Sequence, residues 1–313
     1  MPNHAMVQYG IWPNCCNKCE FCLIKEEFLL TKEQQLDTIE KIIENISYID
    51  WENEFSYGIS LLGGELYYIK DKELQDKILE LIDVIIEKIL KVSKNPDCRY
   101  STVTNGIYDP EFLYRVIDKI VNAVGIGKVD MNFSYDLDFR FKNEDDAKLV
   151  LKNINDFHKR YNYRVGVQMI MTQKLINRWK FGNFDVNEFI EKNIPGNNLC
   201  FLYPHPIYRG NRNLKDFYFN RKDFINFFEY LKRENYDVFL SFINSTKNSA
   251  IFKYTGYTSY SDKFNSVDNQ PKLLDGKEEL QQCGHSILYK CYSDCDKCMM
   301  CDINELYEEE MSV

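Results

Sequence analysis

The residues best suited to chemistry are cysteines near the N-terminus. Cys15, Cys19 and Cys22 have the spacing Cys-x3-Cys-x2-Cys, and Phe21 directly precedes the last of them. Three thiolates this close can each hold one iron of a cubane cluster and leave the fourth iron open to a substrate or cofactor. A zinc ion held by these three and Cys16 is the alternative, because thiolates also select zinc. Adjacent cysteines suit one tetrahedral ion poorly, so we interpret Cys16 as a packed thiol beside the loop.

A second group of cysteines lies near the C-terminus. Three of them follow the Cys-x2-Cys-x2-Cys rhythm of ferredoxin clusters, whose fourth ligand comes from elsewhere in the chain. Either of the two remaining cysteines could supply that ligand. This group therefore predicts a second iron–sulfur cluster, with structural zinc as the alternative. Its members are Cys283, Cys291, Cys295, Cys298 and Cys301.

The first motif resembles the signature of the radical SAM enzymes, which has this spacing and an aromatic residue before the third cysteine. The resemblance implies a [4Fe-4S] cluster whose open iron binds S-adenosylmethionine. It also implies reductive cleavage of this cofactor to a 5'-deoxyadenosyl radical, which abstracts hydrogen from a substrate. Residues 283–301 resemble the SPASM and twitch extensions of these enzymes, which hold auxiliary clusters. Five cysteines are too few for two such clusters, so we expect one auxiliary [4Fe-4S] cluster.

A Gly-Gly-Glu sequence, Gly63, Gly64 and Glu65, follows a predicted strand. In radical SAM enzymes a Gly-Gly-Glu-Pro turn brings backbone carbonyls and the acid near the ammonium group of the cofactor. Glycine suits this position because close backbone approach requires the absence of Cβ. Leu66 replaces the proline of the family pattern, which predicts a less rigid turn.

Short polar side chains follow the next two predicted strands. They resemble stretches that line the methionyl and ribose parts of the cofactor in this family, although such residues are equally typical of turns. The same resemblance places Phe21 near the adenine, with a core aromatic as the alternative. Arg140 is a candidate to bind the cofactor carboxylate, with a surface role as the alternative. Gln168 is a further candidate site residue, which we expect to face the barrel interior. The strand-end residues are Thr104, Asn105, Ser134 and Asp136.

Strands and helices alternate along most of the chain. Alternation of this kind predicts a parallel sheet with right-handed crossovers, and active sites then gather at the C-terminal ends of the strands. The resemblance implies a partial (β/α)6 TIM-type barrel, an α/β fold, over residues 1–235, followed by a small cysteine-rich extension over 236–313. Expected strands are 6–12, 55–62, 99–104, 129–135, 164–172 and 199–203. Expected helices are 31–46, 71–92, one with Asp109 as N-cap and Pro110 first, 143–161, 184–192 and 223–233.

Composition limits the possible partners and compartments. The 313 residues carry a net charge of −9, which argues against a nucleic-acid partner. No signal peptide and no apolar run of membrane-spanning length is visible, so we expect a cytoplasmic protein without a membrane partner. In that reducing compartment, eleven cysteines favour metal or redox work over disulfides.

Radical SAM enzymes with such extensions often modify peptides or proteins. We therefore expect a peptide or protein substrate and a reductase or flavodoxin-type electron donor. Two alternatives stay open. One is a radical SAM enzyme acting on a small molecule or nucleotide, and the other is a non-catalytic module with zinc in both cysteine groups.

Overall fold

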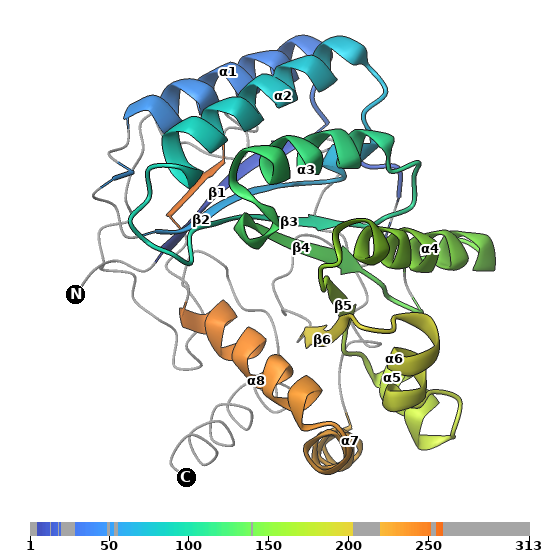
Figure 1. Ribbon diagram of the computed structural model, residues 1–313. Coiled ribbons are helices and arrows are strands. Elements are labelled where there is room, and N and C mark those ends of the chain that lie inside the picture. Colours follow the sequence, from blue (N-terminus) through green and yellow to red (C-terminus); the bar gives the residue numbers. More distant parts are fainter. Residues whose placement is uncertain are drawn as a thin grey trace. The chain divides into compact units, whose positions relative to one another are not determined.

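The computed structural model describes most of the predicted barrel region (Figure 1). The described residues are 5–12, 14–17, 19, 29–48, 51–52, 56–138, 140–202, 220–251 and 255–258. They form two compact units. The first contains the described residues within 1–134 and 148–165 together with 255–258, and the second contains those within 135–147 and 166–251.

The first unit is built on a parallel sheet with the strand order β4-β3-β2-β1-β7. Four of these strands confirm the prediction to within a residue or two, and β7 is an addition that the sequence did not indicate. Their bounds are β1 (Ala5–Trp12), β2 (Ser56–Gly63), β3 (Arg99–Thr104), β4 (Val129–Ser134) and β7 (Thr255–Thr258).

Gly58 explains how β2 and β3 come together. It has a positive φ of 136°, and a Cβ atom at this position would lie 1.8 Å from the backbone oxygen of Arg99. Only glycine avoids that overlap, so the pairing of Gly58 with Arg99 requires it.

Helices α1, α2 and α3 lie on one side of this sheet (Figure 1). The first begins with a capping box, because Thr31 N–H donates to Gln34 Oε1 and Gln34 N–H donates to Thr31 Oγ1. The second is capped by Asp71 and ends in a π-helical turn. The bounds are α1 (Lys32–Tyr48), α2 (Lys72–Ile85), the π-turn η3 (Ile86–Leu90), α3 (Glu111–Val124) and α4 (Glu144–Tyr161).

The start of α3 differs slightly from the prediction. Pro110 occupies the cap position instead of the first helical position. Asp109 still satisfies a donor of the first turn, since its carboxylate accepts the backbone N–H of Glu111 at 3.1 Å.

The two faces of β3 and β4 differ in character. In parallel strands, residues paired in register point to the same face, and Thr104 is paired with Phe133. The ring of Phe133 packs edge-on against Phe157 of α4, so this face lies under the helices. On the opposite face, Ser101 donates a hydrogen bond to Asp130 at 2.9 Å. That face therefore carries the polar pair Ser101 and Asp130 together with Val103, which is 39% exposed.

The second unit contains the parallel pair β5 and β6 and four helices. Helices α5 and α8 were not predicted, because α5 is short and the polar residues after Ser241 hid the end of α8. Buried phenylalanines of α7 and α8 pack together, with Phe228 and Phe239 at a ring separation of 4.8 Å. The bounds are β5 (Gly166–Ile170), α5 (Gln173–Lys180), α6 (Val186–Asn193), β6 (Asn198–Leu202), α7 (Arg221–Glu234) and α8 (Tyr236–Ile251).

Parallel strands alternating with helices confirm the predicted α/β class and are consistent with a partial TIM-type barrel. The five C-terminal cysteines lie outside the described residues. Of the predicted extension over 236–313 the structure describes α8 and β7, and the domain boundary after residue 235 stays a prediction. Within the described part of the chain, no helix combines the length and apolarity that crossing a membrane would need.

Candidate functional site: the cysteine loop and the ends of β2 and β3

The cysteine loop follows β1 directly. Cys15, Cys16 and Cys19 are present as thiols; Cys15 is exposed, Cys16 half-buried and Cys19 buried. The sulfur of Cys15 accepts the backbone N–H of Asn17 at 3.3 Å. The predicted third ligand, Cys22, and the neighbouring Phe21 lie outside the described residues. The described part of the loop therefore presents one accessible sulfur supported by a backbone donor.

The Gly-Gly-Glu turn at the end of β2 is joined to this loop through the backbone. The N–H of Glu65 donates to the carbonyl oxygen of Asn14 at 2.9 Å. Gly63 is exposed and Gly64 half-exposed, whereas only 1% of Glu65 is exposed. The two glycines thus leave backbone groups accessible, and the acid turns into the protein.

The carboxylate of Glu65 accepts hydrogen bonds from three donors. They are Thr104 Oγ1 at 2.9 Å, Asn105 N at 2.6 Å and Tyr67 N at 3.3 Å. Burial raises the pKa of Glu65 to about 7, although these hydrogen bonds oppose the shift. The family resemblance places this acid near the cofactor's ammonium group, which stays a prediction. In the structure its side chain joins the end of β2 to the end of β3.

Thr104 and Asn105 occupy the end of β3 and lie beside the cysteine loop. Thr104 Oγ1 is also 2.5 Å from the hydroxyl of Tyr108. Asn105 Nδ2 lies 3.6 Å from Cys15 Sγ and 3.4 Å from Cys16 Sγ. The structure therefore brings together residues from three of the predicted motifs, the cysteine loop, the glycine turn and the end of β3.

The remaining predicted residues lie after β4. Ser134 is the last residue of that strand and is half-buried. Asp136, in the second unit, accepts the backbone N–H of Ile170 at 2.6 Å and forms a 2.7 Å ion pair with Arg140. Its carboxylate thus joins the end of β5 to Arg140, both within the second unit. Gln168, on β5, is half-buried.

The cysteine loop, the glycine turn and the alternating strands around them lie in a segment that matches the model of a known protein family. Residues 9–181 match the family model described as the Radical SAM superfamily, which is more than half of the chain. The chain belongs to the radical SAM superfamily. The match includes the whole cysteine motif and the ends of β2, β3 and β4.

Solved structures of other radical SAM enzymes resemble the fold. The structure titled "Native anSMEcpe with bound AdoMet and Kp18Cys peptide" aligns with 17% identity and a TM-score of 0.52, covering 80% of this chain and 67% of that one. The structure of SuiB from Streptococcus suis aligns with 11% identity and a TM-score of 0.44, covering 89% of this chain and 54% of that one.

The chain spans 66% of the length of a further anSMEcpe chain solved with AdoMet, which aligns with 17% identity and a TM-score of 0.49 over 80% of this chain. Comparison with curated protein sequences finds no match.

Membership of the radical SAM superfamily implies a [4Fe-4S] cluster and S-adenosylmethionine. The described residues fit a cluster ligand at Cys15, because its exposed sulfur is close to the N–H donors of Asn17 and Asn105, which stabilise negative charge on sulfur. Within the described ranges no three metal-ligating side chains gather, and the predicted ligand Cys22 lies outside those ranges. A three-thiolate set therefore stays a prediction.

Sequence reasoning missed the buried residues that hold the end of β3 in this radical SAM chain. Tyr67 OH donates to Thr102 Oγ1 at 2.8 Å and lies 3.0 Å from Tyr100 OH. Asn153 Nδ2 donates to the carbonyls of Gly106 at 2.8 Å and Tyr108 at 3.0 Å. The available signal for Asn153 was a polar residue within the apolar stripe of α4, next to Ile154.

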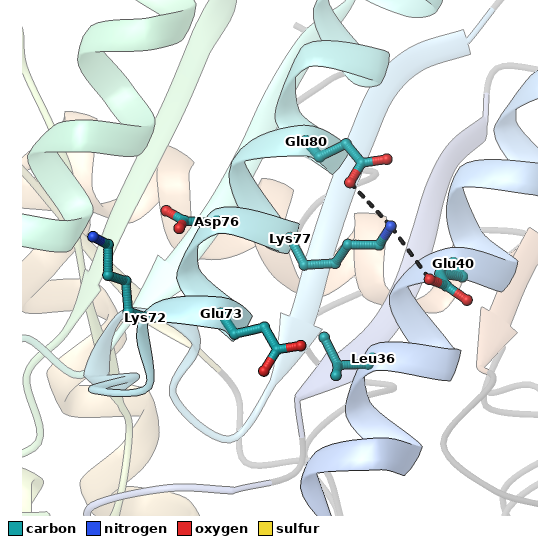
Figure 2. A pocket seen from close by; sticks show the side chains of 7 residues that line it. All are labelled: Leu36, Glu40, Lys72, Glu73, Asp76, Lys77 and Glu80. Carbon is teal, nitrogen blue, oxygen red and sulfur yellow. Dashed lines mark ion pairs between the residues drawn. The ribbon is translucent and has the colours of Figure 1, made fainter.

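A surface groove of about 570 Å³ lies between α1 and α2 and contains none of the predicted site residues (Figure 2). Lys77 points between Glu40 and Glu80, with ion pairs of 3.3 and 3.0 Å. Lys32 pairs with another lining acid, Glu73, at 2.7 Å. The groove is therefore a solvated ion-pair network, separate from the ends of the strands.

Proposed function

We propose that this radical SAM chain reductively cleaves S-adenosylmethionine at a [4Fe-4S] cluster held by Cys15, Cys19 and Cys22. These three thiolates would hold the cluster, which when bound would supply the electron for reductive cleavage of the sulfonium and so make hydrogen abstraction from a substrate possible. The observation that carries the proposal is the family match across the cysteine loop, joined to an accessible Cys15 sulfur beside the exposed Gly63–Gly64 turn.

The residues of the chain prepare the site in distinct ways. Exposure of Cys15 leaves its sulfur available to iron, and the exposed glycines leave backbone carbonyls available to the ammonium group of the cofactor. Glu65 holds the glycine turn and the β3 end at fixed separation through hydrogen bonds to Asn14, Thr104 and Asn105. Thr104, Ser134 and Asp136 remain proposed cofactor-lining residues, whereas the Asn105 amide lies at the sulfurs of Cys15 and Cys16.

We further propose a peptide or protein substrate. The support is that an anSMEcpe structure of similar fold was solved with a bound peptide. An auxiliary [4Fe-4S] cluster in an extension over 236–313 would use four of Cys283, Cys291, Cys295, Cys298 and Cys301, and a reductase or flavodoxin-type protein would supply electrons.

Anaerobic reconstitution tests the cluster assignment. The full chain should bind about eight iron and eight sulfide ions and release 5'-deoxyadenosine from S-adenosylmethionine with dithionite. The triple variant Cys15→Ala, Cys19→Ala, Cys22→Ala should keep about half of the iron and should release no 5'-deoxyadenosine. Stoichiometric zinc without iron, or release of 5'-deoxyadenosine by the triple variant, would contradict the proposal.

The substrate class has its own test. The reconstituted chain is incubated with S-adenosylmethionine and a perdeuterated cell extract, with and without prior digestion by a broad protease that is then removed. Deuterium should appear in 5'-deoxyadenosine, and digestion should abolish the transfer. Transfer that survives digestion would instead identify a small molecule or nucleotide as the hydrogen donor.

A further inference from the structure

The carboxamide of Asn105 has both of its polar atoms engaged inside the chain. Its Oδ1 accepts the backbone N–H of Ile107 at 2.8 Å. Its Nδ2 lies 3.6 Å from the sulfur of Cys15 and 3.4 Å from the sulfur of Cys16. These cysteines are 90 and 89 positions away in the sequence, so the contact depends on the folded arrangement of the β3 end and the cysteine loop.

The amide is held in place from several sides. Asn105 is 5% exposed, and its backbone N–H donates to Glu65 at 2.6 Å. The hydrogen bond from Ile107 N–H to Asn105 Oδ1 closes an Asx-type turn, which fixes the rotamer of the Asn105 side chain. Asn153 holds the carbonyls of Gly106 and Tyr108, so the loop after Asn105 is anchored to α4. Contacts within the chain thus hold the amide nitrogen toward the two sulfurs.

A hydrogen bond from N–H to a ligand sulfur affects the reduction potential of an iron–sulfur cluster. The cluster and its sulfurs carry more negative charge after reduction, so a donor stabilises the reduced form more than the oxidised form. Removing the donor should therefore make the midpoint potential more negative. Because the donor is buried and fixed, little reorganisation is needed when the charge changes.

We propose that Asn105 is a positioning residue whose amide hydrogen-bonds the sulfur of the cluster ligand Cys15 and thereby raises the reduction potential of the N-terminal cluster. This inference rests on the proposed function, since it requires that cluster. It assigns Asn105 to the cluster ligand instead of the cofactor, because both polar atoms of its side chain already have partners in the chain. The same amide contacts Cys16, whose sulfur also lies 3.9 Å from the carbonyl oxygen of Ile107.

The test is a redox titration of the reconstituted full chain followed by electron paramagnetic resonance. The N-terminal cluster is identified as the signal that changes when S-adenosylmethionine is added. Asn105→Leu should shift its midpoint potential to a more negative value. Asn105→Asp keeps an acceptor for the N–H of Ile107 and places a negative charge near the sulfur, so its shift should be in the same direction and larger.

Asn153→Leu is the matched control. It removes the two hydrogen bonds that hold the same loop, and among the described residues Asn153 makes no hydrogen bond to a cysteine sulfur, so the potential should stay at the wild-type value. An equal shift in Asn153→Leu would show that loop displacement, and not the amide, sets the potential. An unchanged potential in both Asn105 variants, with wild-type iron content, would overturn the inference and leave the proposed function intact.

Binding of S-adenosylmethionine separates this role from a direct contact with the cofactor. The affinity of the oxidised chain should be the same for wild type and Asn105→Leu. With a flavodoxin-type electron donor, Asn105→Leu should cleave S-adenosylmethionine more slowly than wild type. Its rate should recover with titanium(III) citrate, a stronger reductant. Weakened cofactor binding at an unchanged potential would overturn the inference, and absence of any cofactor-responsive signal in the wild type would overturn the proposed function as well.

Discussion

The Oε2 atom of Glu65 lies 2.6 Å from the backbone nitrogen of Asn105, and both residues are buried. The backbone N–H of Glu65 bonds to Asn14, the residue immediately before Cys15. Asn105 in turn reaches the sulfur of Cys15. Three segments distant in sequence therefore form a closed ring of hydrogen bonds, which positions the cysteine loop relative to the ends of β2 and β3.

Substitution of the two adjacent cysteines should have unequal effects. Cys15→Ala should lose the N-terminal cluster and the cleavage of S-adenosylmethionine, because its exposed thiol is the predicted ligand. Cys16→Ala should keep both, since the half-buried Cys16 packs against Asn105 and Ile107. Iron content and 5'-deoxyadenosine release check this. Loss of the cluster in Cys16→Ala would show that Cys16 is itself a ligand.

Glu65 should make the stability of the metal-free chain depend on pH. Its pKa is raised from 4.5 to about 7 by burial, so the folded chain binds this proton more tightly than the unfolded chain. Below pH 4.5 this protonated side chain contributes its full stabilisation to the folded chain. The contribution is lost as the pH rises through about 7, and the free energy of unfolding falls by roughly 3 kcal/mol once Glu65 is fully ionised.

The variant Glu65→Gln resembles the protonated acid and should not lose stability over this pH range. Its free energy of unfolding relative to wild type, measured by anaerobic urea titration between pH 4.5 and 8, should therefore increase with pH. A constant difference between the two proteins would mean that Glu65 titrates at its ordinary pKa.

The hydroxyl of Tyr67 should contribute to stability from within the core. Tyr67→Phe removes the donor to Thr102 and the contact with Tyr100, leaving two buried hydroxyls with fewer partners. The expected loss is about 1–3 kcal/mol of unfolding free energy. Tyr68→Phe is the control, since Tyr68 is 40% exposed, and should change stability by less than about 0.5 kcal/mol. Equal effects of the two variants would argue against the buried network.

The ion pair between Asp136 and Arg140 should stabilise the second unit because both side chains are largely buried. Asp136→Ala removes a buried ion-pair partner of Arg140 and the acceptor for Ile170 N–H, at a cost of about 3–5 kcal/mol. Adding Arg140→Met should recover part of that loss. If stability does not recover, the loss comes from the missing hydrogen bond to Ile170 N–H and not from the charge of Arg140.

A more exposed ion pair provides the control for this experiment. Glu188 of α6 pairs with Lys192, and the two side chains are 59% and 70% exposed. Glu188→Ala should cost about 0–1 kcal/mol, because solvent screens an exposed charge. Thermal unfolding of the three proteins, compared at equal metal content, gives the measurement.

The α/β alternation, the main element boundaries and the family motif could be predicted from the amino-acid sequence. These depend on local signals: apolar periodicity, the capping residue Asp109 before α3 and the cysteine spacing. Helix α8 and strand β7 were not predicted, because their formation depends on packing against α7 and pairing with β1.

Only the tertiary structure decided what the site side chains touch. The motif located Glu65 at the end of a strand, but the direction of its carboxylate depends on donors at Thr104 and Asn105, about forty residues later in the chain. The contact of Asn105 with Cys15 likewise joins segments 90 positions apart. Local sequence sets backbone conformation and spacing, whereas hydrogen-bond partners are chosen by how separate segments pack, so they appear only once the chain has folded.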